Sequence, residues 1–508
     1  MPHGGRATDI SRIPSQPMSI EPKEPKFITT LGARDVALMV AISVIGLRWI
    51  PRGARAGAPS VLLWCAAGLL FFLPLALAVV ELSTRYPEEG GLYVWVDRAW
   101  GPGHAFMCGW CVWLNQLFYF ANYLLFAESN VLFVGGKRVA FLADSRVFSA
   151  LFVLCVLWVL TMVNVVGFGV AKWLQNLGTI GIWVPMGILL AASVVALVRT
   201  GSATSFRSSD FMPRGNPLST LSLWSGMCFA FSGLEIAGFV GQEIKHPRRS
   251  LPRGIWVASL LITLVYIAGS VSILVVMPAA NLAERTGIAD AVSLATHSHS
   301  MGLLSAALIA ISVVATTGAW IAAAARVPFA AAVRGTLPQF LKKLHPRFHT
   351  PYVALLLQAA GSSLVLLVAL FWTVGTSQST VEEAYEVMLN VTILIYFVPY
   401  VYLFLAPLRL QGCLEPTAGF VPIPFGRIGR ILVVAMGCIT TSVAIALLFV
   451  PPPGTQNILS FELKVIAQAG AVFLMGLIVY GSRISKNGNS IPAIPQDGPR
   501  TLENGTGL

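Results

Sequence analysis

Long apolar runs recur along this chain of 508 residues, and they constrain its fold more than any other feature. A helix needs about 20 predominantly apolar residues to cross roughly 30 Å of hydrocarbon. Hydrocarbon offers no partners for free backbone amides and carbonyls, so each such run must be helical. Twelve runs reach this length, at about 33–57, 60–82, 104–133, 148–168, 173–197, 219–243, 254–277, 303–333, 352–373, 385–406, 430–450 and 463–481. The sequence therefore predicts an all-α integral membrane protein with twelve transmembrane helices.

The composition agrees with a lipid environment. The chain is 56% hydrophobic and 11% charged, whereas a soluble protein carries about 25% charged residues. Its formal charge of +12 does not indicate nucleic acid, because the basic residues are spread over short connections instead of forming one patch. We expect the lipid bilayer as a partner and no nucleic acid.

The basic residues also predict an orientation, because cytoplasmic loops carry an excess of lysine and arginine. Two dense clusters follow the sixth and the eighth apolar runs. They are Lys245, Arg248, Arg249 and Arg253, and Arg334, Lys342, Lys343 and Arg347. With these clusters inside, both termini are cytoplasmic, and the protein is a multi-pass protein of the inner (plasma) membrane.

Two apolar runs are interrupted near their middle. The first break is Ile45-Gly46-Leu47-Arg48, and the second break is Phe231-Ser232-Gly233-Leu234-Glu235. They lie in the first and sixth runs, which are five runs apart, so their orientations are opposite, as in the inverted repeats of many secondary transporters. The predicted segments are a tail at 1–32, a first repeat at 33–197, an outer loop at 198–217, a second repeat at 218–406, two additional helices at 407–482 and a tail at 483–508.

A helix that unwinds inside the membrane leaves amides at the start of one half and carbonyls at the end of the other. The amides attract an anion and the carbonyls attract a cation, which together match a zwitterion such as an α-amino acid. Gly46 and Gly233 would allow close approach of the solute, and Ser232 adds a hydroxyl. The alternative is that these glycines only let neighbouring helices pack closely.

Each break carries one ionisable residue with more than one possible role. An acid near the middle of a span is costly and usually functional. Glu235 could titrate, pair with a substrate ammonium or hold the broken backbone; it could also be neutralised by a partner such as Asn115. Arg48 could attract a substrate carboxylate, or it could extend to the outer surface together with Arg52 and Arg55.

Further candidates lie on other runs. Asn115, Tyr119 and Asn122 are four and three residues apart, so they share one helix face that should point into the bundle. Phe231 and Trp320 could cover a bound solute, although most buried aromatic residues only pack. Cys108 and Cys111 are expected to pack within a helix, and no cluster with metal-ligand spacing is visible. We therefore expect no metal, no cofactor and no catalytic residues.

Three stretches resemble the amino acid–polyamine–organocation transporter superfamily, over about residues 30–480. They are residues 231–235 with 242–253, residues 81–95, and Gly318-Ala319-Trp320. The resemblance implies a LeuT-like fold of two inverted five-helix repeats plus two additional helices. It also implies recognition of α-carboxylate and α-amino groups at the breaks, gating or side-chain contact by Phe231 and Trp320, and a gating role for Glu235.

The chain departs from the superfamily pattern at two places. The first break lacks the usual Gly-x-Gly and is closer to bacterial glutamate/γ-aminobutyrate antiporters, which have a similar Gly-Leu-Arg. Ile182 occupies the position where proton-coupled members often carry a lysine. We therefore expect an amino-acid exchanger that works by alternating access, as a monomer or homodimer and not an enzyme. The alternatives are proton-coupled uptake of an amino acid or polyamine and, more distantly, an amino-acid sensor.

Overall fold

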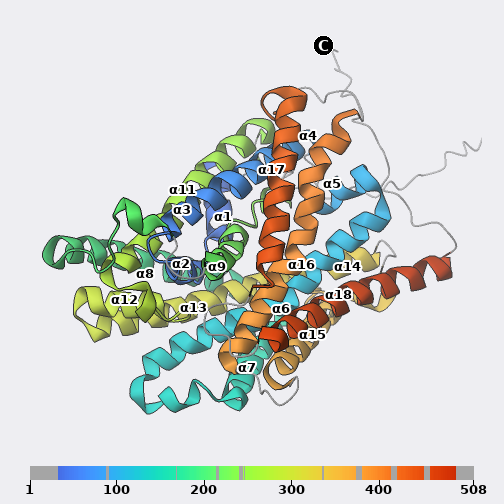
Figure 1. Cartoon of the computed structure of the whole chain (residues 1–508). Coiled ribbons are helices and arrows are strands. Elements are labelled where there is room, and N and C mark those ends of the chain that lie inside the picture. Colours follow the sequence, from blue (N-terminus) through green and yellow to red (C-terminus); the bar gives the residue numbers. More distant parts are fainter. Residues whose placement is uncertain are drawn as a thin grey trace, which may run out of the picture.

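The computed structural model describes residues 32–86, 91–167, 169–212, 217–239, 244, 246–333, 337–372, 380–412, 420–450 and 458–487 (Figure 1). Its α-helices are α1 (Ala33–Val44), α2 (Trp49–Ala54), α3 (Ser60–Ala67), α4 (Leu73–Arg85), α5 (Gly91–Trp100), α6 (Pro102–Gly135), α7 (Arg146–Val166), α8 (Gly169–Thr200), α9 (Pro217–Ala230), α10 (Ile236–Phe239), α11 (Pro247–Val276), α12 (Gly287–Thr296), α13 (His299–Ala324), α14 (Arg326–Val333), α15 (Tyr352–Phe371), α16 (Val381–Arg409), α17 (Gly426–Leu447) and α18 (Ile458–Asn487). The predicted all-α architecture is confirmed.

Ten helical stretches of the described residues are long and apolar enough to cross a membrane. They coincide with ten of the twelve predicted runs, and one of them joins α3 to α4 through a π-helical turn at Gly68–Phe72. The first and sixth runs fall short of this length because each is split into two helices, α1 with α2 and α9 with α10. The chain is thus a multi-pass membrane protein. The total of twelve spans and the inverted repeat stay predictions.

Local sequence explains several helix ends. The hydroxyl of Ser145 accepts a hydrogen bond from the Phe148 amide at the start of α7, and Thr380 caps α16 in the same way through the Glu383 amide. At the other end of α7, Gly167 adopts a φ of +120° that other residues rarely tolerate, and the helix stops there.

Two long helices form the centre of the molecule. Over the most apolar stretch of each helix, the buried share is 67% for α6 and 61% for α16, against 33% for α7 and for α18. The helix α6 packs on α13, α15 and α16, while α1 lies along α11 and α9 contacts α2, α3 and α17 (Figure 1). The two interrupted spans therefore lie inside the bundle, while α7 and α18 present much of their surface to lipid.

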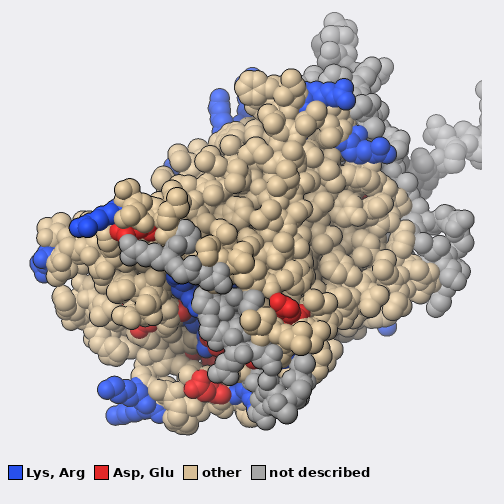
Figure 2. Space-filling model, in the orientation of Figure 1, with Lys and Arg blue, Asp and Glu red and all other residues tan. Residues whose placement is uncertain are grey.

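The surface fits a membrane protein. On the face shown in Figure 2, uncharged side chains cover most of the area, and the charged side chains lie at its upper and left edges and in its lower half. Large apolar side chains on the outside of the bundle, such as Leu151, Leu260 and Leu474, are more than half exposed. Such exposure is favourable only next to hydrocarbon.

Candidate functional site

One tyrosine hydroxyl joins the two breaks. The amide of Gly46 donates to the hydroxyl of Tyr266, on α11, across 3.1 Å. The same hydroxyl lies 2.9 Å from the carbonyl of Val44, the last residue of α1, and 3.0 Å from that of Ala230, the last residue of α9. A donor and an acceptor of the first interrupted span and an acceptor of the second therefore converge on this hydroxyl.

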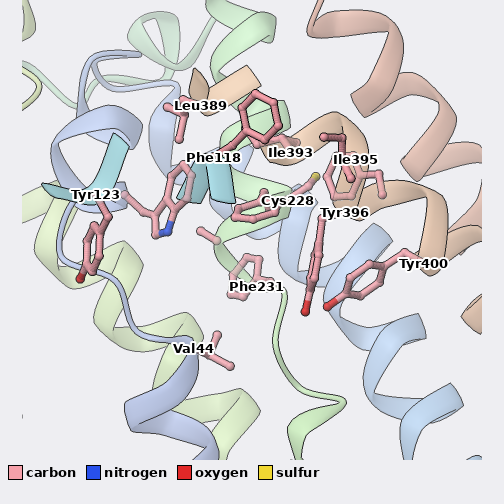
Figure 3. Close-up of a cluster of buried hydrophobic side chains, with 14 of the residues drawn as sticks. Val44, Phe118, Tyr123, Cys228, Phe231, Leu389, Ile393, Ile395, Tyr396 and Tyr400 are labelled. Atoms are coloured by element: carbon pink, nitrogen blue, oxygen red, sulfur yellow. The ribbon is translucent and has the colours of Figure 1, made fainter. Parts of the chain in front are cut away.

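The second break is held by two tyrosines of α16. Glu235 is 3% exposed, and its carboxylate accepts a hydrogen bond from Tyr396 at 2.5 Å and another from Tyr400 at 2.7 Å. Tyr400 also accepts from the amide of Gly233 at 2.8 Å. Figure 3 shows the two tyrosines approaching from different directions, with their hydroxyls next to each other. Glu235 thus holds the broken backbone through Tyr400, which is one of the roles predicted for it; Asn115 is not its partner.

Aromatic rings surround the junction between the breaks. Phe231 is fully buried, stacks on Phe72 with ring centroids 4.5 Å apart, and meets Trp64 and Tyr266 edge to face. Trp64 in turn stacks on Tyr266 at 4.6 Å and donates its indole N–H to Ser270. The packing fixes the ring of Tyr266 and so places its hydroxyl.

Arg48 does not extend to the surface, which was one of its two predicted roles. Its side chain is buried at 1% exposure, and Nη1 donates to Oδ1 of Asn122 on α6. The guanidinium carbon lies 4.5, 4.7 and 4.9 Å from the ring centroids of Trp49, Tyr119 and Tyr123. The cation is thus enclosed by aromatic faces, which attract it through their quadrupoles.

The predicted polar face of α6 is present. Asn122 donates to the hydroxyl of Thr392 at 3.1 Å, and Asn115 donates to the carbonyl of the same residue at 2.6 Å. Tyr119 and Asn122 also contact Arg48. This face therefore points into the bundle, where it ties α6 to α16 and supports the first break.

Of the two arginines that follow the first break, Arg52 is buried and Arg55 is partly buried. Arg52 donates to Glu284 at 2.5 Å and to Glu386 at 3.0 Å, and Arg55 donates to Glu284 at 2.5 Å. Glu284 lies between α11 and α12, and Glu386 lies on α16. Burial opposes ionisation of Glu284, but Arg52 and Arg55 outweigh it and lower its pKa from 4.5 to about 2. We call these four residues the ion cluster.

A second buried ion pair lies at the end of α4, in the stretch 81–95. Glu81 is fully buried and accepts from Nε of Arg430 on α17 at 2.9 Å and from the amide of Ile423 at 2.7 Å. This contact fastens α4 to the segment that precedes α17. Glu81 therefore has a structural role, and Pro87–Gly90 of the same stretch lie outside the described residues.

Not all of the predicted site residues contact the two breaks through their side chains. Trp320 is partly buried on α13, and no hydrogen bond or ring contact of the described residues joins it to either break. Among the described residues, Ser232 makes only a backbone hydrogen bond, from its amide to the carbonyl of Phe229. Ile45 and Leu47 are buried at the first break. The structure thus brings together both breaks and the α6 face, but not Trp320.

Sequence reasoning missed the tyrosines that hold the breaks. Tyr396 and Tyr400 are four residues apart in an apolar run, so their hydroxyls share one helix face, and this signal could have been used. Tyr266 gave no such signal, because it stands alone in the seventh run. Glu284 and Glu386 are 232 and 334 residues from Arg52, and no local pattern links them.

The model of the amino acid permease family matches residues 31–476. The chain belongs to the amino acid permease family. It is 25% identical to an uncharacterised transporter of Legionella pneumophila, over 85% of this chain and 92% of the relative. It is 25% identical to a glutamate/γ-aminobutyrate antiporter of Lactococcus lactis, over 76% of each chain. It is 23% identical to a protein of the same species named a probable agmatine/putrescine antiporter, over 61% of this chain and 67% of the relative. This permease is thus a transporter and not an enzyme.

Proposed function

We propose that this permease exchanges amino acids across the plasma membrane by alternating access, with the solute bound between the two breaks and both termini in the cytoplasm. The observation that carries the proposal is the hydroxyl of Tyr266, on which groups of both breaks converge. An α-carboxylate could take over the Gly46 amide, and an α-ammonium could take over the carbonyls of Val44 and Ala230. A zwitterion would then replace the bonds that one hydroxyl now makes.

The ion cluster supports alternating access. Its buried ion pairs join the end of the first span to α16 and to the connection before α12. These contacts close the end of the bundle that we predict to be outer. For the solute to pass, they must separate and form again in each cycle, while the solute site stays fixed between the breaks.

Exchange is favoured over proton-coupled uptake by two observations. Both Lactococcus relatives are named antiporters. Ile182 is buried on α8, so the lysine of proton-coupled members has no substitute at that position. The alternative rests on Glu235, a buried carboxylate whose described partners are tyrosines and not a cation.

Two measurements test the proposal. A thermal-shift screen of the purified protein against the common amino acids and their decarboxylation products identifies ligands, because a ligand that binds the folded state stabilises it. Reconstituted vesicles then separate the mechanisms. Uptake that requires an identified ligand inside the vesicle supports exchange. Uptake into empty vesicles driven by a pH gradient contradicts it and supports the alternative.

A further inference from the structure

Arg48 carries a positive charge that no described side chain neutralises. The ion pairs of the described residues include Arg52 and Arg55 but not Arg48. Its Nη1 has one neutral partner, Asn122, and its Nη2 is buried without a hydrogen-bond partner. A buried charge without a counter-ion is costly and needs an explanation.

The neighbouring ion cluster does not supply the missing charge. Arg48, Arg52 and Arg55 follow one another at the first break, and the cluster provides two carboxylates, Glu284 and Glu386. Three arginines against two glutamates leave an excess of one positive charge. The aromatic rings around Arg48 attract the cation, but they carry no net charge.

We propose that Arg48 binds a carboxylate of the transported solute, so that substrates must carry a carboxylate and diamines are excluded. The inference rests on the proposed function, because it places the solute at the first break. A guanidinium presents paired N–H groups that match the two oxygens of a carboxylate. The free Nη2 and its position within the break make Arg48 available for this contact. The carboxylate can be the α-carboxylate or an acidic side chain.

The first test is ligand binding to the purified full-length protein, with four probes in a thermal-shift assay. L-Glutamate carries both carboxylates, L-glutamine only the α-carboxylate, γ-aminobutyrate a single terminal carboxylate, and putrescine none. We expect stabilisation by at least one carboxylate probe and none by putrescine. Stabilisation by putrescine equal to or larger than that by every carboxylate probe would overturn the proposal.

Two variants then test Arg48 itself. R48Q removes the charge, and N122D places a carboxylate beside Arg48 and keeps the arginine, so it remains informative if R48Q does not fold. Each should weaken binding of the carboxylate ligand by about tenfold to a hundredfold, as expected for loss of a hydrogen bond to a charged group. The matched control is R285Q, which removes a positive charge paired with the half-exposed Glu382 outside the ion cluster and should leave the ranking of the probes unchanged.

The pattern of losses identifies the source of the carboxylate. Loss of glutamate binding with retained glutamine binding assigns the contact to the side chain, and equal loss of both assigns it to the α-carboxylate. Unchanged affinities of R48Q and N122D for the carboxylate probes would show that Arg48 and the rings around it have only a structural role. Vesicle exchange is measured separately: carboxylate-specific binding without exchange rejects the proposed mechanism of transport and leaves the role of Arg48 standing.

Discussion

The two breaks bury opposite charges and treat them differently. At the second break, both oxygens of Glu235 accept hydrogen bonds from tyrosines of α16, and one of these tyrosines also holds the Gly233 amide. At the first break, Arg48 has one amide partner, an aromatic cage and an unpartnered Nη2. The polar groups of Glu235 are therefore satisfied by the protein itself, whereas Nη2 of Arg48 has no hydrogen-bond partner among the described residues.

The glycines of the two breaks are needed for different reasons. Gly233 has a φ of +102°, a backbone conformation that residues with a side chain rarely adopt. An added Cβ at this position would lie 3.4 Å from Val44. Gly46 has no positive φ, but an added Cβ would lie 2.8 Å from Cδ1 of Trp49, which covers Arg48. Gly233 is therefore needed for its backbone conformation, and Gly46 is needed because it leaves space for the Trp49 ring beside Arg48.

The largest effect is expected at the second break. Gly233→Leu should abolish transport and leave the protein folded, because the side chain forces the backbone out of its present course and blocks approach to it. Counterflow in vesicles and size-exclusion chromatography of the purified variant check both parts. Normal uptake by a folded Gly233→Leu protein would remove the sixth span from the site and leave only the first break.

The ion cluster provides the next largest effect, on the side of the first break. Glu284→Gln leaves Arg52 and Arg55 with only Glu386, and loss of one partner of a buried pair costs about 3–5 kcal/mol. The thermal midpoint in detergent should fall clearly. Glu382→Gln is the matched control, because Glu382 is half exposed in its pair with Arg285 and such pairs contribute about 0–1 kcal/mol.

Equal midpoints for Glu284→Gln and Glu382→Gln would contradict this account. The ion cluster would then contribute no more than a surface pair, and the closure that it is proposed to provide would have to come from other contacts.

The spans and the positions of both breaks could be predicted because their signals are local. The length of each apolar run can be read directly from the sequence, and Gly46 and Gly233 interrupt the first and the sixth of these runs. The helix face of Asn115, Tyr119 and Asn122 was predictable for the same reason, since spacing alone places side chains on one side of a helix. Ten of the predicted runs reappear as continuous helices among the described residues.

The partners of the breaks could not be predicted, because they come from distant parts of the chain. Tyr266 is 220 residues from Gly46, and Tyr400 is 167 residues from Gly233. The sequence also left two roles open for Arg48, since a long cationic side chain can reach the surface or stay inside. Only the position of Tyr119 on α6 beside the first break decides this, because the guanidinium lies over its ring.

A smaller effect on the thermal midpoint is expected when each of the three tyrosines at the breaks is replaced by phenylalanine. Tyr266→Phe removes the hydroxyl shared by both breaks and leaves the Gly46 amide and two carbonyls unsatisfied, which costs about 1–3 kcal/mol. Tyr400→Phe affects the second break alone, and Tyr396→Phe removes one bond to Glu235. The midpoints should fall most for Tyr266→Phe and least for Tyr396→Phe. The reverse order would mean that the second break, and not the shared hydroxyl, holds the two spans together.

The smallest expected effect is that of pH on the ion cluster. Because Arg52 and Arg55 lower the pKa of Glu284 from 4.5 to about 2, its ionisation stabilises the fold fully above about pH 4.5, and this stabilisation is lost as the pH falls through about 2. The difference in midpoint between the natural protein and Glu284→Gln should therefore stay constant from about pH 8 to about pH 5 and shrink only in stronger acid. A difference that changes within that interval would mean that a carboxylate of the ion cluster titrates there and that the first break responds to pH. A constant difference leaves Glu284 ionised throughout, so any pH dependence of exchange in this interval must come from another group.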